Sequence, residues 1–473
     1  MIEVGRNSIV VRDVDPKSKD FKNVNYKYSL YDKVLHKYTF SAFTLIDRDV
    51  YFPASVGVDE VRSHFRDQEV VFNYKTTAKS SAVSYKMKHQ PRDELQRKAI
   101  SFLMGMEKDD QIRERFLSLA TGSGKTYVTI NVASRLKKKP LIIVDTLELA
   151  SQWKREFLNH SDLKEDDIVI LSGNESVQDE MKEKSGQAYI AIHRTLGNML
   201  EADYNSVNLL MNRLRIGIRV FDEAHVNFKN VCMINALSNV EYTIFLTATP
   251  SRSGFSEDHL YGKIFRKIPY FNGKDIADEK YHTVVLFPMD TKPGLDEKLS
   301  VKTKYGFNSS RWAAYIEKGG YEFFWETIVD IFDKFKLKER DMKVAIMLPT
   351  INLIRKLESD LKDKMSIDGG IFIGEVKKED RAKALESKVI LTNDKIFDKG
   401  IDVKDLEVLI NFVPFGSLVK TEQIIGRLRY GEKKQSILVD VTDYGFEECV
   451  KQFKVRRRFY KKKAKKIVEI ERN

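Results

Sequence analysis

A run of small residues ahead of a lysine is the first segment of this sequence that could do chemistry. The segment reads ATGSGKT; it follows the apolar stretch RFLSL and precedes a helical pattern. In such a loop, backbone N–H groups close on phosphate oxygens and the helix N-terminus adds a partial positive charge. The strict GxxxxGK[ST] pattern fails at Leu119, so a glycine-rich turn before a helix is the alternative. We predict a phosphate loop made of Thr121, Gly122, Ser123, Gly124, Lys125 and Thr126.

Two adjacent carboxylates form the second candidate site. Asp222 and Glu223 come directly after the apolar run IRVF, 97 residues after Lys125, in the word DEAH. Asp222 can hold Mg²⁺ together with the Thr126 hydroxyl, and Glu223 can orient and deprotonate an attacking water. An acidic helix N-cap is the other interpretation of the pair. Its place downstream of the phosphate loop favours ATP and Mg²⁺ as cofactors.

Alternating strand and helix patterns must position these residues. Short β-branched runs such as LIIVD, IVIL, IRVF and TIFLTA alternate with helical stretches such as KTYVTINVASRLKKK from about residue 91. This alternation predicts a parallel sheet covered by helices. The same texture returns after a less regular stretch, with VAIML, VILT and SILVDV as expected strands. We therefore predict an α/β protein with two consecutive parallel-sheet lobes.

The N-terminal residues have a different texture. SIVVRDV, YTFSAFTLI and EVVFNYKT alternate apolar and polar residues, as half-buried strands do. We expect a separate β-rich or α+β accessory domain at 1–90, whose aromatics form its own core or whose surface contacts nucleic acid. The expected boundaries are 1–90, a first lobe at 91–255, a loop-rich connection at 256–308, a second lobe at 309–450 and a basic helix or tail at 451–473.

Composition narrows the class of protein. The 473 residues are 42% hydrophobic and include 10 Pro and 24 Gly, which excludes a disordered or fibrous chain. Only two cysteines are present, far apart, so neither a disulfide framework nor structural zinc is expected. No apolar run approaches the roughly 18 residues of a membrane span. We expect a cytoplasmic protein with no membrane partner.

Charge is concentrated at the two ends of the chain. The net charge of +12 comprises +9 in residues 451–473 and +4 in residues 1–90, which leaves the body between them near neutral. In the tail, Val450, Phe453, Tyr460, Ala464 and Ile467 follow a helical spacing that Arg457 interrupts. The tail is then either a helix docked on the second lobe with a solvated basic face, or a surface that binds DNA phosphates.

The order of the motifs points to a family. ATGSGKT, DEAH and then TATP resemble motifs I, II and III of superfamily 2 helicases and translocases. The resemblance implies two RecA-like lobes with ATP bound between them, and translocation along nucleic acid driven by ATP hydrolysis. It also implies that His225, Thr247 and Thr249 couple hydrolysis to movement.

Flanking segments extend the resemblance through the first lobe. PRDELQRKAI looks like the adenine-recognition segment, with Gln96 as the base reader and Arg92 as its support. VDTLELASQW and AIHRTL are similar to two strand-contact motifs and imply that Thr146 and Thr195 contact nucleic acid. Asp145 departs from the pattern, since relatives often have Pro at that place.

The second half continues the family pattern. VAIMLPT resembles motif IV and VILT leads into motif V, which implies that Thr350 and Thr392 contact nucleic acid. GIDV and QIIGRLR resemble motifs V and VI. The family's second arginine falls where this chain has Tyr430, so the role of Arg429 depends on the local backbone. The nucleotide contacts implied in this half are Gly400, Asp402, Gln423, Arg429 and the arginine finger Arg427.

The overall layout resembles phage branch-migration helicases of the UvsW type and, more distantly, RecG and the helicase subunits of restriction enzymes. That resemblance implies branched or forked DNA as the substrate, recombination, repair or replication proteins as partners, a monomer, and a bacterial host cytoplasm. An RNA helicase and a restriction-type duplex translocase are the alternatives within the enzyme class. A nucleic-acid-binding scaffold with a degenerate motor is the non-enzyme alternative, although Lys125, Glu223 and Arg427 are all present.

Overall fold

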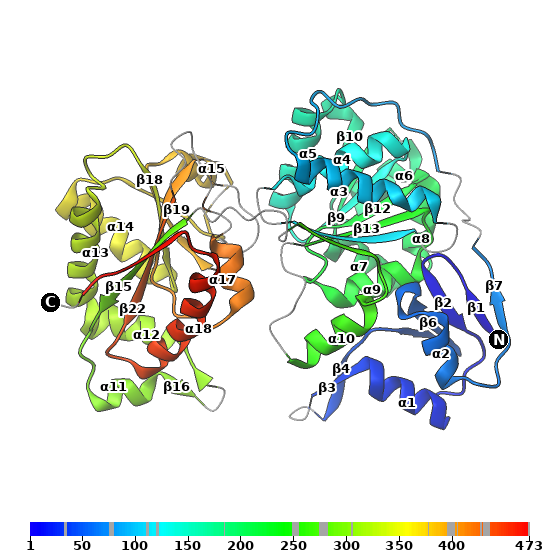
Figure 1. The fold of residues 1–473 in the computed structure, drawn as a ribbon, viewed down its shortest axis with the longest axis horizontal. Coiled ribbons are helices and arrows are strands. Elements are labelled where there is room, and N and C mark those ends of the chain that lie inside the picture. Colours follow the sequence, from blue (N-terminus) through cyan, green and yellow to red (C-terminus); the bar gives the residue numbers. More distant parts are fainter. Residues whose placement is uncertain are drawn as a thin grey trace. The chain divides into compact units, whose positions relative to one another are not determined.

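The structure, a computed structural model, divides into two compact units, residues 1–278 and 279–473. It describes residues 1–32, 36–74, 80–109, 113–119, 123–183, 185–247, 255–273, 282–303, 306–376, 378–394, 403, 405–425, 428 and 436–471. Each unit contains its own seven-stranded parallel sheet (Figure 1). Among the described helices, none has the length and the apolar character that crossing a membrane would need.

The first unit is built on the sheet β10-β11-β9-β12-β13-β8-β14. Its strands are β8 (Glu114–Ser118), β9 (Pro140–Val144), β10 (Ile168–Leu171), β11 (Ala188–Ile192), β12 (Ile218–Phe221), β13 (Tyr242–Thr247) and β14 (Tyr270–Asn272). The inner strands β8, β9, β12 and β13 are buried along their whole length. The mostly apolar sequences of β9 (PLIIV) and β13 (YTIFLT) fit this position, because a parallel sheet is covered on both faces.

Two layers of helices cover the first sheet. The helices are α3 (Glu94–Met104), α4 (Lys125–Leu136), α5 (Leu147–His160), α6 (Asn174–Glu183), α7 (His193–Ala202), α8 (Ser206–Leu214), α9 (Phe228–Leu237) and α10 (Phe255–Phe265). Alternate side chains along the strands enter two cores. One core contains residues of α3, α4 and α5, and the other contains residues of α7, α8, α9 and α10 (Figure 1).

The N-terminal residues form a mixed sheet that belongs to the same compact unit. Its order is β5-β6-β2-β1-β7, in which β1 and β7 are parallel and the other pairs are antiparallel. The elements are β1 (Ile2–Val4), β2 (Ser8–Val11), α1 (Lys19–Tyr28), β5 (Thr44–Ile46), β6 (Asp49–Pro53), α2 (Val58–His64), β7 (Val70–Phe72) and the hairpin of β3 (Ser29–Asp32) and β4 (Lys37–Ser41). This matches the α+β character expected for the N-terminal part.

The N-terminal sheet shares a core with the first lobe. Its buried residues are continuous with those of α7, α8, α9 and α10. Asn7 joins the two parts by polar contacts as well: its Nδ2 donates to Thr243 Oγ1 (3.2 Å), and its Oδ1 accepts from the backbone N–H of Val240 (2.9 Å). We expected a separate domain at 1–90, whereas the described contacts attach this region to the first lobe through buried apolar and polar groups.

The second unit is built on the sheet β19-β20-β18-β21-β22-β15-β23. Its strands are β15 (His282–Met289), β18 (Lys343–Leu348), β19 (Gly369–Phe372), β20 (Val389–Asn393), β21 (Leu406–Asn411), β22 (Ser436–Asp443) and β23 (Lys466–Glu469), and a small hairpin pairs β16 (Lys302–Thr303) with β17 (Gly306–Phe307). The helices are α11 (Leu295–Ser300), α12 (Ser309–Tyr315), α13 (Tyr321–Phe335), α14 (Ile351–Met365), α15 (Lys378–Glu386), α17 (Leu418–Ile425) and α18 (Glu447–Lys463). The fold class predicted from the sequence, two parallel-sheet α/β lobes with a small N-terminal sheet, is confirmed.

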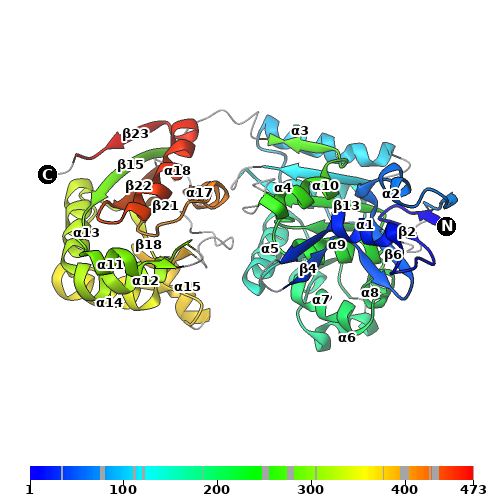
Figure 2. The same cartoon turned by 90° about the horizontal axis from the view of Figure 1, so that it is seen from below.

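Two expected boundaries differ from the structure. The stretch 256–308 was expected to be a loop-rich connection, but β14 extends the first sheet and β15 is an inner strand of the second. The segment 451–473 was expected to be a terminal helix or tail; α18 is such a helix, docked on the second lobe through Phe453 and Tyr460, but β23 after it pairs in parallel with β15 (Figures 1 and 2). The reason is common to both cases, because a strand that belongs to a sheet built elsewhere in the chain has no local signal of its partner.

The two parallel sheets have the same topology. When the strands of each sheet are numbered in chain order, both sheets read 3-4-2-5-6-1-7. The second lobe therefore repeats the architecture of the first, with β23 at the position of β14.

Candidate functional site

The loop between β8 and α4 holds the predicted phosphate-binding residues. The structure describes Ser123, Gly124, Lys125 and Thr126, whereas Thr121 and Gly122 lie outside the described residues. Gly124 has a φ of 89°, and a Cβ at this position would lie 2.2 Å from Gln96 Nε2. The backbone conformation therefore favours glycine, and a larger residue would also displace the end of the Gln96 side chain. Lys125 begins α4, as a loop that places phosphate at a helix N-terminus requires.

Lys125 and Glu223 face each other across this loop. The Lys125 Nζ lies 3.3 Å from Glu223 Oε1 and donates to the backbone oxygen of Leu119 at 3.3 Å. The Lys125 side chain is mostly buried, since 12% of it is exposed. Lys125 of motif I and Glu223 of motif II are 98 residues apart in the sequence, and they meet at the carboxyl edge of the first sheet.

Asp222 is oriented by two donors. Trp153 Nε1, from α5, donates to Asp222 Oδ2 at 2.8 Å, and the backbone N–H of Glu223 donates to Oδ1 at 3.0 Å. Burial, together with the neighbouring charge of Glu223, raises the pKa of Asp222 to about 6. A carboxylate whose ionised form is disfavoured in this way gains from a nearby cation.

The oxygen donors at this edge fit magnesium. Asp222 stands at the end of β12, and Thr126 lies in the first turn of α4. Within the described residues, no group of three or more His, Cys, Asp or Glu side chains could hold a metal ion alone. Mg²⁺ commonly takes one or two protein oxygens and completes its shell with water and phosphate oxygens, which this donor set allows.

Glu223, His225 and Thr247 form a small polar cluster. Thr247 Oγ1 lies 2.9 Å from His225 Nδ1 and donates to Glu223 Oε2 at 3.4 Å; His225 Nδ1 lies 3.3 Å from the same Oε2. Glu223 has a φ of 47°, a left-handed conformation that is unusual for this residue type and that clusters at functional sites. The cluster links motif II to the first residue of motif III, while Thr249 lies outside the described residues.

Gln96 and Arg92 lie beside the phosphate loop. Gln96 is buried, its Oε1 accepts from the backbone N–H of Arg92 (3.0 Å), and its Nε2 is 3.5 Å from the backbone oxygen of Ser123. The Arg92 guanidinium donates to Asp93 at 2.9 Å and is largely exposed. The placement of Gln96 against the loop is compatible with base recognition, which stays a prediction.

The four threonines predicted to contact nucleic acid have local partners. Thr146 and Thr350 are N-caps that accept from the backbone N–H groups of Leu149 and Leu353, each at 3.3 Å. Thr195 is buried and accepts from the backbone N–H of Gly173 (3.1 Å); Thr392 is completely buried in β20. Thr146 and Thr350 lie at partly exposed helix N-termini, so they are placed better for a backbone contact than the two buried threonines.

Most predicted site residues of the second lobe lie outside the described residues. This applies to Gly400, Asp402, Arg427 and Arg429. Gln423 belongs to α17, but its side chain is not described. An ion pair between Lys420 and Asp394 connects α17 to the end of β20, and so brings the segments that lead into motifs V and VI together.

Sequence reasoning missed several contacts around motif II. Trp153 is 69 residues from Asp222, and no spacing rule connects them. Asn227 Nδ2 donates to Asp145 Oδ1 at 2.5 Å, which gives a partner to the residue that departs from the family pattern. Asn227 has a φ of 51° and precedes α9, so the DEAH segment turns sharply into this helix.

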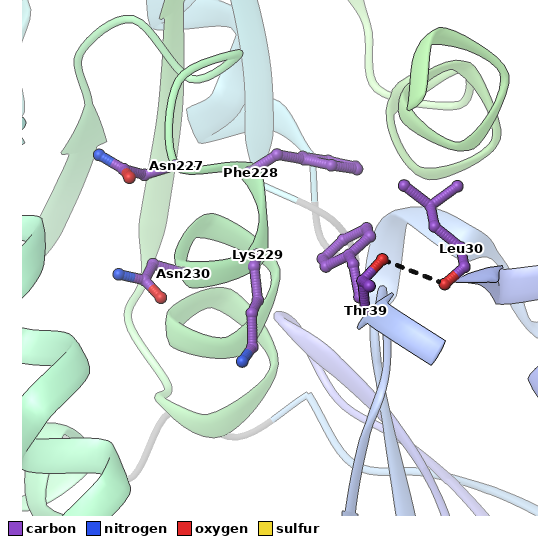
Figure 3. A pocket seen from close by; sticks show the side chains of 7 residues that line it. Leu30, Thr39, Asn227, Phe228, Lys229 and Asn230 are labelled. Carbon is purple, nitrogen blue, oxygen red and sulfur yellow. Dashed lines mark hydrogen bonds between the residues drawn. The ribbon is translucent and has the colours of Figure 1, made fainter. Parts of the chain in front are cut away.

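A cavity of about 380 Å³ lies where α9 meets the N-terminal hairpin. Figure 3 shows Phe228 reaching from the start of α9 toward Leu30 and Thr39 of the hairpin. Phe40 contacts Phe228, with ring centroids 5.4 Å apart. The cavity is lined by Leu30, Thr39, Phe40, Asn227, Phe228, Lys229 and Asn230. It is separate from the phosphate loop and borders the helix that follows motif II.

Comparison with known proteins extends these observations. The family "Type III restriction enzyme, res subunit" matches residues 87–252, which lie in the first lobe. The putative DNA 3'-5' helicase Rad25 of Haloarcula marismortui is 25% identical over 376 residues, which cover 74% of this chain and 55% of that protein. The DNA 3'-5' translocase XPB2 of Sulfurisphaera tokodaii is 23% identical over 370 residues, 69% of this chain and 77% of that one. This chain thus spans little more than half the length of the Rad25 relative.

The fold has counterparts among solved structures. Saccharomyces cerevisiae Dbp5 bound to RNA and ADP BeF3 superposes with a TM-score of 0.55 at 12% identity, covering 80% of this chain and 89% of Dbp5. The likeness identifies both parallel-sheet lobes as RecA-like. The finer resemblance to UvsW-type and RecG-type proteins stays a prediction. The family match, the relatives and the fold together show that the chain is similar to superfamily 2 helicases, which are nucleic-acid-dependent ATPases.

Proposed function

We propose that this protein is an ATP-dependent DNA helicase or translocase. The observation that carries the proposal is the convergence of Lys125, Asp222, Glu223 and Thr247 at the carboxyl edge of one parallel sheet. Crevices at this edge are where open α/β sheets bind their ligands. The arrangement supports phosphate binding and proton transfer side by side.

The proposed mechanism begins with the Lys125 and Glu223 ion pair. Phosphate oxygens would draw the Lys125 ammonium away from Glu223, and the freed carboxylate would accept a proton from the attacking water. Thr126 and Asp222 would hold Mg²⁺, which neutralises charge on the phosphates. Thr247 and His225 keep the other Glu223 oxygen in place, so they would transmit changes at the carboxylate toward motif III.

The second lobe would complete the site. Arg427 is the proposed arginine finger, with Gly400, Asp402 and Gln423 as further nucleotide contacts and Arg429 as a candidate. Closure of the lobes on ATP and reopening after hydrolysis would shift the grip on a nucleic acid strand.

DNA is the proposed substrate because the names of two matched relatives specify DNA. The RNA-bound structural neighbour is 12% identical and supports the fold alone. The match to the restriction enzyme family favours a second candidate, a translocase that moves along duplex DNA without separating the strands.

Branched DNA is the proposed specific substrate, with roles in recombination, repair or replication. The β3–β4 hairpin packs on α9 and exposes Tyr31 (50%) and Tyr38 (42%), whose ring centroids are 5.2 Å apart. A bulge in the hairpin pairs Tyr31 with Tyr38, and exposed aromatic rings can stack on unpaired bases. The hairpin therefore supports a contact with unpaired bases beside the ATP-binding unit.

One panel of substrates tests these proposals. ATP hydrolysis and strand release are measured with a Holliday junction, a fork, a linear duplex with a single-stranded tail, a blunt duplex and matched RNA. We expect the greatest stimulation by branched DNA, and the Glu223→Gln variant should bind ATP but not turn it over. Equal stimulation by RNA would eliminate the DNA proposal. Equal stimulation by branched and linear DNA would eliminate the branch preference, and hydrolysis without strand release would favour the duplex translocase.

A further inference from the structure

The outer side of α18 carries a row of exposed cations. Lys451, Lys454, Arg458, Lys461 and Lys462 are all exposed and follow one another at intervals of three, four, three and one residues. Spacings of three and four place residues on one helix face, and Lys462 joins this face because it lies four residues after Arg458. The row from first to last is about 16 Å long at ~1.5 Å per residue. We refer to these five residues as the basic face.

The opposite side of α18 is fixed to the second sheet. Arg456 is buried and donates to both carboxylate oxygens of Asp440, from Nε to Oδ2 (3.0 Å) and from Nη2 to Oδ1 (3.1 Å). Tyr460 also donates to Asp440 Oδ2, at 2.9 Å. Phe453 is buried in the same core. These contacts hold the basic face in one orientation, so it is not the surface of a loose tail.

Most of the positive charge on the basic face is not neutralised by nearby carboxylates. Glu447 pairs with Lys451, while Glu448 pairs with Lys302 and Glu469 with Arg457. The other four cations of the basic face form no ion pair with any described residue. Like charges at these spacings repel one another by a few tenths of a kcal/mol per pair, at ~0.2–0.5. An extended anion would relieve this repulsion.

We infer that the basic face binds the phosphate backbone of duplex DNA. This rests on the proposed DNA function and adds the location of a contact to it. The aromatic residues Phe453 and Tyr460 of α18 are buried and Phe459 is half-buried, so the face offers no exposed ring for stacking on unpaired bases. Binding of single strands usually combines cations with such rings, whereas charge supplies essentially all of the non-specific binding to a duplex backbone.

A hydrogen bond connects α18 to the segment that precedes α17, the helix that leads into motif VI. Arg456 Nη1 donates to the backbone oxygen of Phe415 at 2.6 Å, just before α17 begins at Leu418. The helix α17 leads into motif VI and pairs with the end of β20 through Lys420 and Asp394. A DNA backbone held by α18 is thereby connected to α17, the helix that precedes the proposed arginine finger in the sequence.

Substitutions on the surface test this inference better than truncation does. Deleting 451–473 would also remove Arg456, Tyr460 and β23, and so would damage the second sheet. The test protein carries Lys454, Arg458, Lys461 and Lys462 each replaced by Gln. The control carries Lys334, Lys336, Lys338 and Arg340 replaced by Gln. These four cations are also exposed, and they lie in the last turn of α13 and the turn that follows it. Helix α13 packs against the other face of the second sheet (Figure 1).

The measurement is the affinity for blunt duplex DNA across a series of salt concentrations. Each lost phosphate contact should reduce the magnitude of the slope of log K against log salt by about 0.9. If all four cations bind phosphates, the total reduction should be about 3.6. The control should keep the slope of the wild type, and both variants should keep its thermal unfolding and its ATP hydrolysis without DNA. An unchanged slope in the test protein, or an equal reduction of the slope in the control, would overturn this inference and leave the proposed function standing. A wild-type protein that binds no DNA would overturn the proposed function and this inference with it.

Discussion

The two lobes share one topology and differ in what lies at the carboxyl edge of the sheet. In the first lobe, strand β8 leads into the phosphate loop, and Asp222 and Glu223 follow β12. In the second lobe, the corresponding first strand β15 is followed by Thr291, and Asp443 ends β22. The same edge is thus a candidate nucleotide site in one lobe and an internal hydrogen-bonded cluster in the other.

The difference lies in how many donors each carboxylate receives. Asp443 accepts from the backbone N–H and the hydroxyl of Thr291, from Trp312 Nε1 and from the backbone N–H of Gly445, at 2.7 to 3.3 Å. Asp222 accepts from Trp153 and from the backbone of Glu223. A carboxylate surrounded by protein donors has little capacity left for a cation. The shared strand order therefore does not determine the chemistry of each edge. The side chains at the edge determine it.

Among the described residues, each lobe also contains a fully buried arginine, Arg219 in the first and Arg456 in the second, and the two are held differently. Arg456 forms a direct two-bond ion pair with Asp440, and although burial lowers its pKa, the Asp440 charge outweighs this and raises it. Arg219 is held by neutral oxygens, among them Ser238 Oγ (2.6 Å) and Thr243 Oγ1 (3.1 Å), and burial lowers its pKa to about 9. The buried arginine of the first lobe is thus held by a network of neutral hydrogen-bond acceptors, and that of the second lobe by an ion pair.

The largest expected effect comes from breaking that pair. Arg456→Met leaves Asp440 buried without its cation, and removing one partner of a buried ion pair costs about 3–5 kcal/mol. We expect this loss in the free energy of unfolding of the second unit, measured by urea denaturation. Adding Asp440→Asn should recover much of it, because the second change removes the unpaired charge. A single variant within about 1 kcal/mol of the wild type would contradict the pair's role.

A smaller effect concerns pH and the network of the first lobe. Burial raises the pKa of Glu114 to about 7, although Asn235, Arg219 and Asn7 act against it. From pH 4.5 to 7 the unfolded chain has lost a proton that the folded chain keeps. Stability should therefore fall as pH rises through this window, by about 1.4 kcal/mol per unit and at most about 3 kcal/mol.

The variant Glu114→Gln isolates this contribution. It has no proton to lose at this position, so its urea midpoint for the first unit should depend less on pH between 4.5 and 7 than that of the wild type. Parallel curves for the two proteins would show that Glu114 does not titrate in this window.

The smallest expected effects come from two matched tryptophans. Trp153 donates to Asp222 and Trp312 donates to Asp443, at 2.8 and 3.0 Å. Trp153→Phe should raise the Mg²⁺ concentration for half-maximal ATP hydrolysis about tenfold, because it removes the N–H donor that orients Asp222, the proposed metal ligand. Trp312→Phe should instead destabilise the second unit by about 1 kcal/mol and leave the Mg²⁺ requirement unchanged. Equal Mg²⁺ requirements in both variants would remove the distinction between the two edges.

The sequence supported the fold class well because parallel-sheet lobes have a local signature. Buried strands such as β9 and β13 are mostly apolar runs, and they alternate with helical patterns along the chain. It located β23 poorly, since the pairing of Lys466–Glu469 with β15 joins segments about 180 residues apart. Local patterns cannot report a partner at that distance.

At the candidate site, too, some features could be predicted from the sequence and others could not. The phosphate loop and DEAH word are contiguous, so the residue types Lys125, Asp222 and Glu223 could be named from spacing alone. The cap positions of Thr146 and Thr350 and the burial of Thr392 could not, because they depend on which surfaces the neighbouring elements cover.

By itself, the sequence determined the order of the motifs, the two-lobe α/β class and the concentration of positive charge at the ends, because all three are properties of contiguous residues. Only the tertiary structure decided that the N-terminal sheet shares a core with the first lobe, that Trp153 orients Asp222, and that Arg456 turns the cations of α18 outward. These depend on buried contacts between segments distant in the chain, and packing, not spacing, selects them.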